Sequence, residues 1–93
     1  MSIIKQELYI AKKTKNKELQ VLLSTLVFAS MKDEGCVAFE VYQSDDDVNE
    51  FLVYSEFKDN EAFTKHEKSE PKKALTKKFE ELVLKKEILP ILD

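Results

Sequence analysis

The chain has 93 residues, of which 43% are hydrophobic and 35% are charged, and its formal net charge is −3. This composition is typical of a globular protein, and an acidic balance without arginine argues against nucleic-acid binding, which needs a basic surface. Cys36 is the only cysteine, so neither an internal disulfide nor a cysteine-based metal cluster is expected. No segment reads as a signal peptide or a membrane span, and we therefore expect a cytoplasmic protein with one domain over residues 1–93.

The first two predicted elements are a strand and a helix. Residues 3–11 alternate between apolar and polar side chains, as a half-buried strand does. Leucines at helical spacing then predict a helix from about residue 16 to about residue 34. Asn16 is expected to cap this helix through its side chain, and Gly35 is expected to end it in the left-handed conformation.

The second half of the chain predicts a hairpin, two helices and a final strand. Residues 36–43 and 50–57 alternate and are joined by an acidic turn, which is typical of a hairpin. Asp59 is expected to cap a short helix, and Ser-Glu-Pro at 69–71 begins a lysine-rich helix that extends to about residue 86. The final residues, 88–93, predict at most a short edge strand, because their proline has no N–H to donate.

The order strand, helix, strand, strand, helix, strand predicts an α+β fold of the ferredoxin-like split βαββαβ type. Such a fold has an antiparallel sheet with its helices on one face. We expect six residues to face the helices, namely Ile4, Leu8, Val37, Phe39, Val53 and Phe57. The opposite face is expected to carry Tyr9, Tyr42, Tyr54, Leu52, Cys36 and Ala38, together with Glu7, Glu40 and Glu56.

This opposite face is less polar than a sheet surface that contacts water usually is. An apolar patch of this kind is typical of a partner surface. The pattern predicts a homodimer formed through Tyr9, Tyr42, Leu52 and Tyr54, and a solvated face with scattered aromatic residues is the alternative.

Short motifs between residues 35 and 75 carry a family resemblance. They are Gly35-Cys36, Phe39-Glu40, Tyr54 with Phe57, Asp59, the run Ala62-Phe63-x-x-His66, and Ser69 with Lys73-Ala74. In order and spacing these motifs resemble the antibiotic biosynthesis monooxygenase domain family, whose members are small quinol monooxygenase-like proteins. The resemblance implies a dimeric α+β barrel, and a cofactor-independent monooxygenase that acts on a quinol or an aromatic polyketide-like small molecule.

Three departures from the family pattern bear on the reaction. Where the family often has Glu-x-Trp at the end of the third strand, this chain has Ser55-Glu56-Phe57. A second histidine that many members carry is replaced in the stretch 70–72, and Thr76 stands where haem-degrading relatives have an iron ligand. These departures leave open a non-catalytic or ligand-binding relative that has lost the active site. The missing second histidine and the lack of arginine disfavour an isomerase of small sugar-derived signals.

His66, the only histidine, is the candidate catalytic residue under this resemblance. It follows Ala62 by four positions and Phe63 by three, so the three side chains share one helix face and are expected to point toward the sheet. Phe39, Phe57 and Phe63 are the candidate substrate-binding residues. A histidine that only packs is the alternative. No metal or other cofactor is expected, because the chain has one histidine, one cysteine and no glycine-rich phosphate loop.

Overall fold

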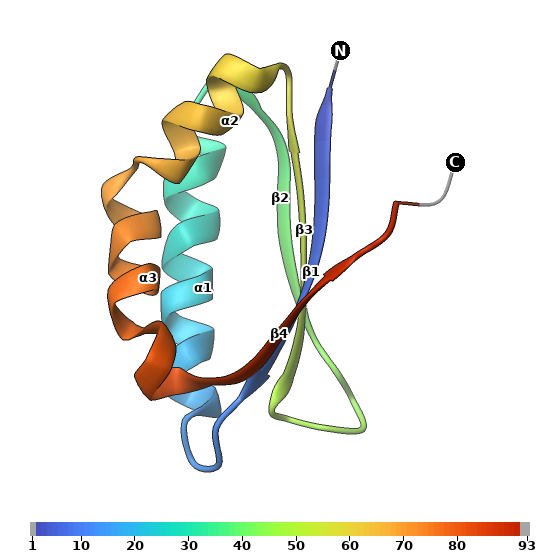
Figure 1. Ribbon diagram of the computed structural model, residues 1–93, viewed down its shortest axis with the longest axis vertical. Helices are drawn as coiled ribbons and strands as arrows, with labels where there is room; N and C mark the ends of the chain where they lie inside the picture. The colour runs from blue at the N-terminus through green and yellow to red at the C-terminus, as the bar shows by residue number, and fades with distance from the viewer. Residues whose placement is uncertain (1, 92–93) are drawn as a thin grey trace.

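The computed structural model describes residues 2–91. Its elements are β1 (Ile3–Ala11), α1 (Asn16–Met31), β2 (Cys36–Gln43), β3 (Glu50–Phe57), α2 (Asn60–Glu67), α3 (Glu70–Leu82) and β4 (Val83–Leu89). The four strands form one antiparallel sheet in the order β2-β3-β1-β4. Figure 1 shows the three helices on one side of this sheet. The predicted ferredoxin-like α+β fold is confirmed, with α2 and α3 together in the place of the second helix.

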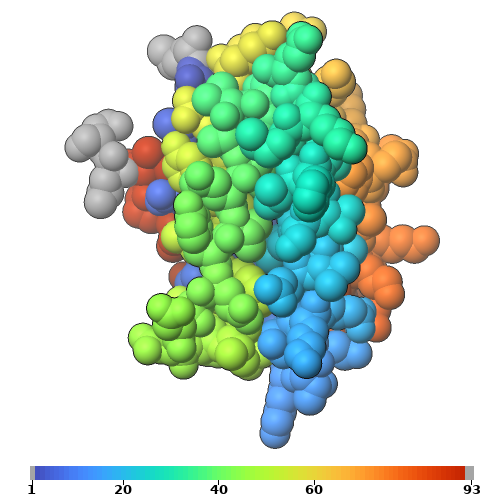
Figure 2. Space-filling view, turned by 180° about the vertical axis from the view of Figure 1, so that it is seen from behind, coloured from blue at the N-terminus to red at the C-terminus, as the bar shows by residue number. Residues whose placement is uncertain are grey.

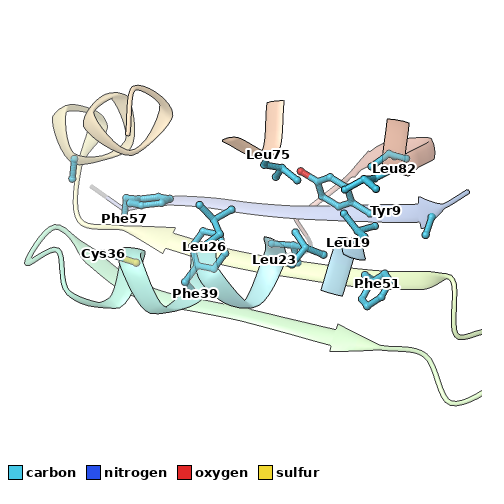
Figure 3. Close-up of a cluster of buried hydrophobic side chains, with 14 residues drawn as sticks. Tyr9, Leu19, Leu23, Leu26, Cys36, Phe39, Phe51, Phe57, Leu75 and Leu82 are labelled. Atoms are coloured by element: carbon cyan, nitrogen blue, oxygen red, sulfur yellow. The ribbon is translucent and has the colours of Figure 1, made fainter. Parts of the chain in front are cut away.

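The helices of residues 2–91 are amphipathic rather than uniformly apolar, and none of them is long and apolar enough to cross a membrane. Leu19, Leu23 and Leu26 form the buried stripe of α1. Figure 2 shows α1 and β2 side by side along the molecule, where the helix covers one edge of the sheet. Figure 3 shows these leucines close to aromatic side chains of the sheet, so the core lies between the sheet and the helices.

Two of the predicted helix caps are wrong. The N-cap of α1 is Lys15, with no side-chain hydrogen bond, and Asn16 is the first helical residue. The helix ends at Met31, and its C-cap Lys32 is right-handed. Gly35 does not have a positive φ. It is needed for a close approach instead, because a Cβ at this position would lie 2.5 Å from the Cβ of Ala62 on α2.

The other two predicted caps are confirmed. The Asp59 carboxylate accepts a hydrogen bond of 2.9 Å from the backbone N–H of Ala62 and so begins α2. The Ser69 hydroxyl accepts a bond of 3.4 Å from the N–H of Lys72, and Pro71 occupies the first turn of α3, where its missing N–H costs nothing.

The last strand is longer and begins earlier than predicted. β4 starts at Val83, directly after α3, within the lysine-rich stretch that the sequence assigned to a helix. It pairs with β1 at one edge of the sheet, as expected for the last strand, and it ends at Leu89 before Pro90. Residues 92 and 93 of the predicted strand lie outside the described residues.

The predicted faces of β1 are reversed. Glu7 pairs with Val53, and Tyr9 pairs with Phe51; paired residues share a face, and this one is turned toward the helices. Figure 3 shows Tyr9 on the helix side of the sheet beside α3, where it is only 2% exposed. Tyr9 is therefore a core residue and was wrongly assigned to the partner surface. Ile4 and Leu8, which were expected in the core, lie on the opposite face with Leu52 and Glu56.

A register shift between Cys36 and Ala38 accounts for the errors in β2. The irregularity advances the in-out alternation by one residue. Val37 is 52% exposed rather than packed under the helices, and Cys36 is buried in the core rather than on the opposite face. Beyond the shift the prediction is correct, because Phe39 is buried with Val53 and Phe57.

The face without helices is called the open face below. It holds Ile4, Leu8, Ile10, Ala38, Tyr42, Leu52, Tyr54 and Leu89, with Gln6, Glu40, Glu56, Lys85 and Glu87. Tyr42, Leu52 and Tyr54 lie where the sequence predicted them. Most of its apolar side chains are half-buried among their neighbours.

Candidate functional site

His66 lies on α2 and points at the sheet, as its spacing from Ala62 and Phe63 predicts. The residue is 8% exposed. Its ring centroid lies 4.8 Å from that of Phe57 and 5.4 Å from that of Phe39. The Asp59 cap and the contact of Ala62 with Gly35 fix the start of α2, and this start sets the direction of the imidazole.

Phe63 joins the same cluster from the neighbouring helical position. Its ring meets that of Phe57 edge-on, at 5.7 Å between centroids. Phe57 therefore contacts both His66 and Phe63, and the structure brings together all four residues that the sequence singled out: Phe39, Phe57, Phe63 and His66. The imidazole is the polar group of this aromatic cluster.

Ser30, which the sequence did not single out, is the hydrogen-bonding neighbour of this imidazole. The buried Ser30 Oγ lies 3.4 Å from Nδ1 of His66. Ser30 follows Leu26 by one helical turn in α1, so the helical spacing places it on the buried face, although the spacing does not indicate its contact with His66.

A group of charged residues lies beside the aromatic cluster and was also missed. Glu7 is buried, and Lys86 on β4 approaches its Oε2 to 2.9 Å without the geometry of a hydrogen bond. Lys72 lies 3.5 Å from Glu67. The Lys5 ammonium lies over the ring of Phe63, 4.9 Å from its centroid. Reading β1 with Tyr9 inward would have placed Glu7 and Lys5 on this side of the sheet.

These charges and the burial of the site set its protonation. Burial lowers the pKa of His66, and the Lys72 ammonium lowers it further, while Glu67 and Glu7 oppose the shift. Burial alone would raise the pKa of Glu7. The ammonium groups of Lys86, Lys72 and Lys5 outweigh it, so the pKa of this carboxyl lies below its ordinary value. At neutral pH the site therefore combines a neutral imidazole with an ionised carboxylate.

Two cavities adjoin His66. The inner cavity, between the sheet and the helices, has a volume of only about 10 Å³. It is lined by the aromatic cluster and by Lys5, Glu7, Tyr9, Leu23, Leu26, Val53, Ser55, Glu67 and Lys72. The side cavity measures about 130 Å³ and is lined by Ala29, Ser30, Asp33, Phe57, His66, Ser69 and Pro71. The imidazole and the ring of Phe57 border both spaces.

A wider hollow of about 370 Å³ lies apart from the imidazole, and charged side chains from Lys32 to Lys65 line it. Asp33 is common to this hollow and to the side cavity. Within residues 2–91, no three histidine, cysteine, aspartate or glutamate side chains gather as a metal site would require. A buried neutral imidazole can accept a proton, and the rings of Phe39 and Phe57 beside it offer an apolar surface.

Comparisons with solved structures show where this fold recurs. The chain is similar to a conserved protein from Methanosarcina mazei at 26% identity, over 96% of this chain and 89% of that one, with a TM-score of 0.84. A protein from Shewanella oneidensis is 21% identical over 95% and 86% of the two chains, with a TM-score of 0.87. A candidate antibiotic biosynthesis monooxygenase from Bacteroides thetaiotaomicron is 14% identical over 99% and 89%, with a TM-score of 0.90.

A search of curated protein sequences finds no match to this chain. The family model of the antibiotic biosynthesis monooxygenase domain, in contrast, matches residues 1–78. This match covers the motifs from Gly35 to Ala74, the aromatic cluster and His66. The chain belongs to the antibiotic biosynthesis monooxygenase family.

Proposed function

We propose that the protein is a cofactor-independent monooxygenase that oxidises a quinol or a related hydroxylated aromatic molecule bound between the sheet and the helices. One observation carries the proposal: a buried imidazole, kept neutral at ordinary pH, lies against the rings of Phe39 and Phe57. Membership of the family supports the reaction class. His66 is the proposed catalytic residue, and Phe39, Phe57 and Phe63 are the proposed substrate-binding residues.

The imidazole supplies the proton transfer that such a reaction needs. Neutral His66 accepts the proton of a substrate hydroxyl, because its lowered pKa keeps it unprotonated near neutrality. The electron-rich substrate anion then bonds to dioxygen through a ring carbon. Loss of water from the resulting hydroperoxide leaves one oxygen atom in the quinone product and the other in water. The substrate provides all the electrons, so the balance requires no further reductant.

The inner cavity must open before a substrate can enter. Pockets for small molecules usually measure about 300–1,000 Å³, whereas the inner cavity holds roughly one water molecule. Lys5 and Lys72 border it with long side chains that can turn outward into solvent. The side cavity gives His66 room on its other side. We propose that ligand binding displaces these lysines and joins the two spaces.

The small inner cavity also favours the alternative, a non-catalytic or ligand-binding relative that has lost the active site. A protein that no longer turns over a substrate does not need an open cavity, and its own side chains can fill the site. In this case His66 contributes packing against Phe57 and no proton transfer.

We further propose that the protein forms a homodimer through the open face. Figure 1 shows no helix on this side of the sheet. Leu8 and Leu52 pair at its centre, and Tyr54 lies beside them on β3. A second copy would bury these side chains face to face, as stacked sheets do. Tyr42 and Tyr54 are the two tyrosines of the predicted interface that remain available for it.

Oxygen incorporation tests the proposed reaction. Supplied with 1,4-dihydroxynaphthalene and ¹⁸O₂, the active enzyme should release a hydroxynaphthoquinone that carries one ¹⁸O atom, whereas plain autoxidation gives naphthoquinone and hydrogen peroxide. The variants His66→Ala and His66→Gln should lose this labelled product, while Thr64→Ala on the exposed side of α2 should keep it. If the wild-type protein binds the quinol without labelling any product, the ligand-binding function replaces the enzymatic one.

A further inference from the structure

Lysine side chains from three different elements lie at the inner cavity or beside a residue that lines it. Lys5 comes from β1, Lys72 from the first turn of α3, and Lys86 from β4. Lys5 and Lys72 line the cavity together with His66. The Lys72 side chain is 14% exposed, which is far below the exposure of a lysine that merely lies on a surface.

The acidic partners of these lysines do not balance them. Lys86 is paired with Glu7, and Lys72 with Glu67. Within residues 2–91, Lys5 forms no ion pair and only covers the face of Phe63. The Glu67 side chain is 37% exposed, so water and salt weaken its attraction to Lys72. Among the lining residues, two ammonium groups meet two carboxylates. Because Lys86 from outside the lining already pairs with Glu7, the ammonium group of Lys5 is left as the excess positive charge beside the cavity.

The lysines act on two titratable groups that line the cavity, Glu7 and His66. The pKa of Glu7 and the pKa of His66 lie below their ordinary values, and burial alone would raise the first of them. The ammonium groups of Lys86, Lys72 and Lys5 explain the lowered pKa of Glu7. Burial is the main cause of the lowered pKa of His66, and Lys72 and Lys5 lower it against the opposing carboxylates of Glu67 and Glu7. A ligand whose anionic oxygen stops at the rim would meet the same ammonium groups, while its ring would lie against Phe57 and Phe63.

We propose that Lys5 and Lys72 form an anion subsite at the rim of the cavity, and that this subsite selects hydroxylated aromatic ligands that carry a carboxylate. The inference rests on the proposed binding of an aromatic ring beside His66. Lysine suits this role because its ammonium acts as a point charge on a flexible stem, which can swing out to admit the ring and then return to the carboxylate. Glu7 does not oppose it, because Lys86 already compensates the buried carboxylate.

A matched pair of probes tests the subsite. 1-Hydroxy-2-naphthoate and 1-naphthol share a hydroxylated ring and differ by one carboxylate. Titration calorimetry should show that the wild-type protein binds the naphthoate about tenfold more tightly, the preference expected of one charge-assisted hydrogen bond. High salt should reduce this preference, since the rim is accessible to ions.

Lysine variants test which residues cause the preference for the naphthoate over 1-naphthol. Lys72→Met and Lys5→Met should each lower the affinity for the naphthoate more than the affinity for 1-naphthol, and so remove most of the preference. Lys72→Arg should retain it, which separates charge from the packing of the stem. Lys77→Met, on the exposed surface of the same helix, is the control and should change neither affinity. Thermal unfolding of each variant checks that it is folded.

The outcomes separate this inference from the proposed reaction. Equal affinities for the two probes, no binding of either, or equal losses in Lys72→Met and Lys77→Met would overturn the anion subsite. Labelled product from 1,4-dihydroxynaphthalene would still support the monooxygenase. A lysine-dependent preference without any labelled product would support the subsite and reject the reaction.

Discussion

The hydroxyl of Ser30 lies 3.4 Å from Nδ1 of His66, and this contact links the last turn of α1 to α2 above the sheet. The change Ser30→Ala leaves the imidazole nitrogen without this partner. Because the contact is long, we expect a loss of about 0.5–1 kcal/mol in the free energy of unfolding, at the low end for a buried hydrogen bond. Urea denaturation measures it. Ser24→Ala, on the exposed face of α1, is the control and should be neutral or slightly stabilising, because alanine is the better helix former.

The approach of Gly35 to Ala62 predicts a clash and its rescue. A Cβ at position 35 would lie 2.5 Å from the Cβ of Ala62, which is too close for two carbon atoms. We expect Gly35→Ala to destabilise the protein by about 1–3 kcal/mol, as overpacking usually does. Adding Ala62→Gly should recover part of this loss, although glycine in a helix costs about 1 kcal/mol by itself. Strictly additive effects in this double-mutant cycle would contradict the contact.

The cap of α2 predicts the next effect. Asp59 accepts a bond of 2.9 Å from the N–H of Ala62, so Asp59→Ala should cost about 1 kcal/mol, whereas Asp59→Asn should cost little because asparagine caps equally well. The weaker cap of α3, with 3.4 Å between Ser69 and the N–H of Lys72, should make Ser69→Ala the milder change. Chemical denaturation of the three variants compares them. A larger loss for Ser69→Ala than for Asp59→Ala would contradict this ranking.

The sequence predicted the order of the elements because hydrophobic periodicity and capping residues are local signals. Asp59, Ser69 and the spacing from Ala62 to His66 are of this kind, and the structure has α2 and α3 where they indicated. The sequence pattern could not assign the two faces of β1, because both faces of this strand carry apolar or aromatic side chains. Ile4 and Leu8 looked like core residues, yet Tyr9 takes that place under α3.

Part of the candidate site could likewise be predicted from local signals, and part of it could not. The aromatic cluster and His66 follow from one family pattern and one helical repeat. The charged group could not be predicted, because Glu7, Lys72 and Lys86 meet only through the pairing of β4 with β1 and the packing of α3. The sequence assigned the first residues of β4 to a lysine-rich helix, and the pairing of β4 with β1 was therefore not predicted. The register shift at Cys36 likewise leaves no mark in the alternation of residues 36–43.

The open face predicts a charge-sensitive dimer. Leu52 pairs with Leu8 at the centre of this face, so Leu52→Lys should place a charge in the proposed interface and weaken self-association by at least tenfold, as an unpaired buried charge does. Sedimentation equilibrium measures the change. Val21→Lys is the control, because Val21 is an exposed apolar residue on α1, away from the open face, and its variant should associate like the wild type. A wild-type protein that stays monomeric at high micromolar concentration would contradict the dimer.

The buried imidazole predicts that the folded protein loses stability on mild acidification. Burial holds the pKa of His66 below its ordinary value of 6.5, so the unfolded chain binds a proton that the folded chain resists. The unfolded state therefore binds more protons in this range, and the free energy of unfolding falls with falling pH. The stabilisation is present above about pH 6.5 and is lost as the pH falls from there through the folded pKa. Urea denaturation at a series of pH values from 7.5 down to about 3 measures this slope.

His66→Gln isolates the effect, because His66 is the only histidine of the chain. The glutamine variant should show a much flatter stability between pH 7.5 and 5, even if it is less stable at every pH. The lowered pKa of Glu7 acts in a separate range, since its stabilisation is lost only below its ordinary value of 4.5. The two losses should therefore appear as distinct steps in the wild type, and only the lower step should remain in His66→Gln. Parallel slopes for the two proteins above pH 5 would show that the imidazole is not held neutral by the fold.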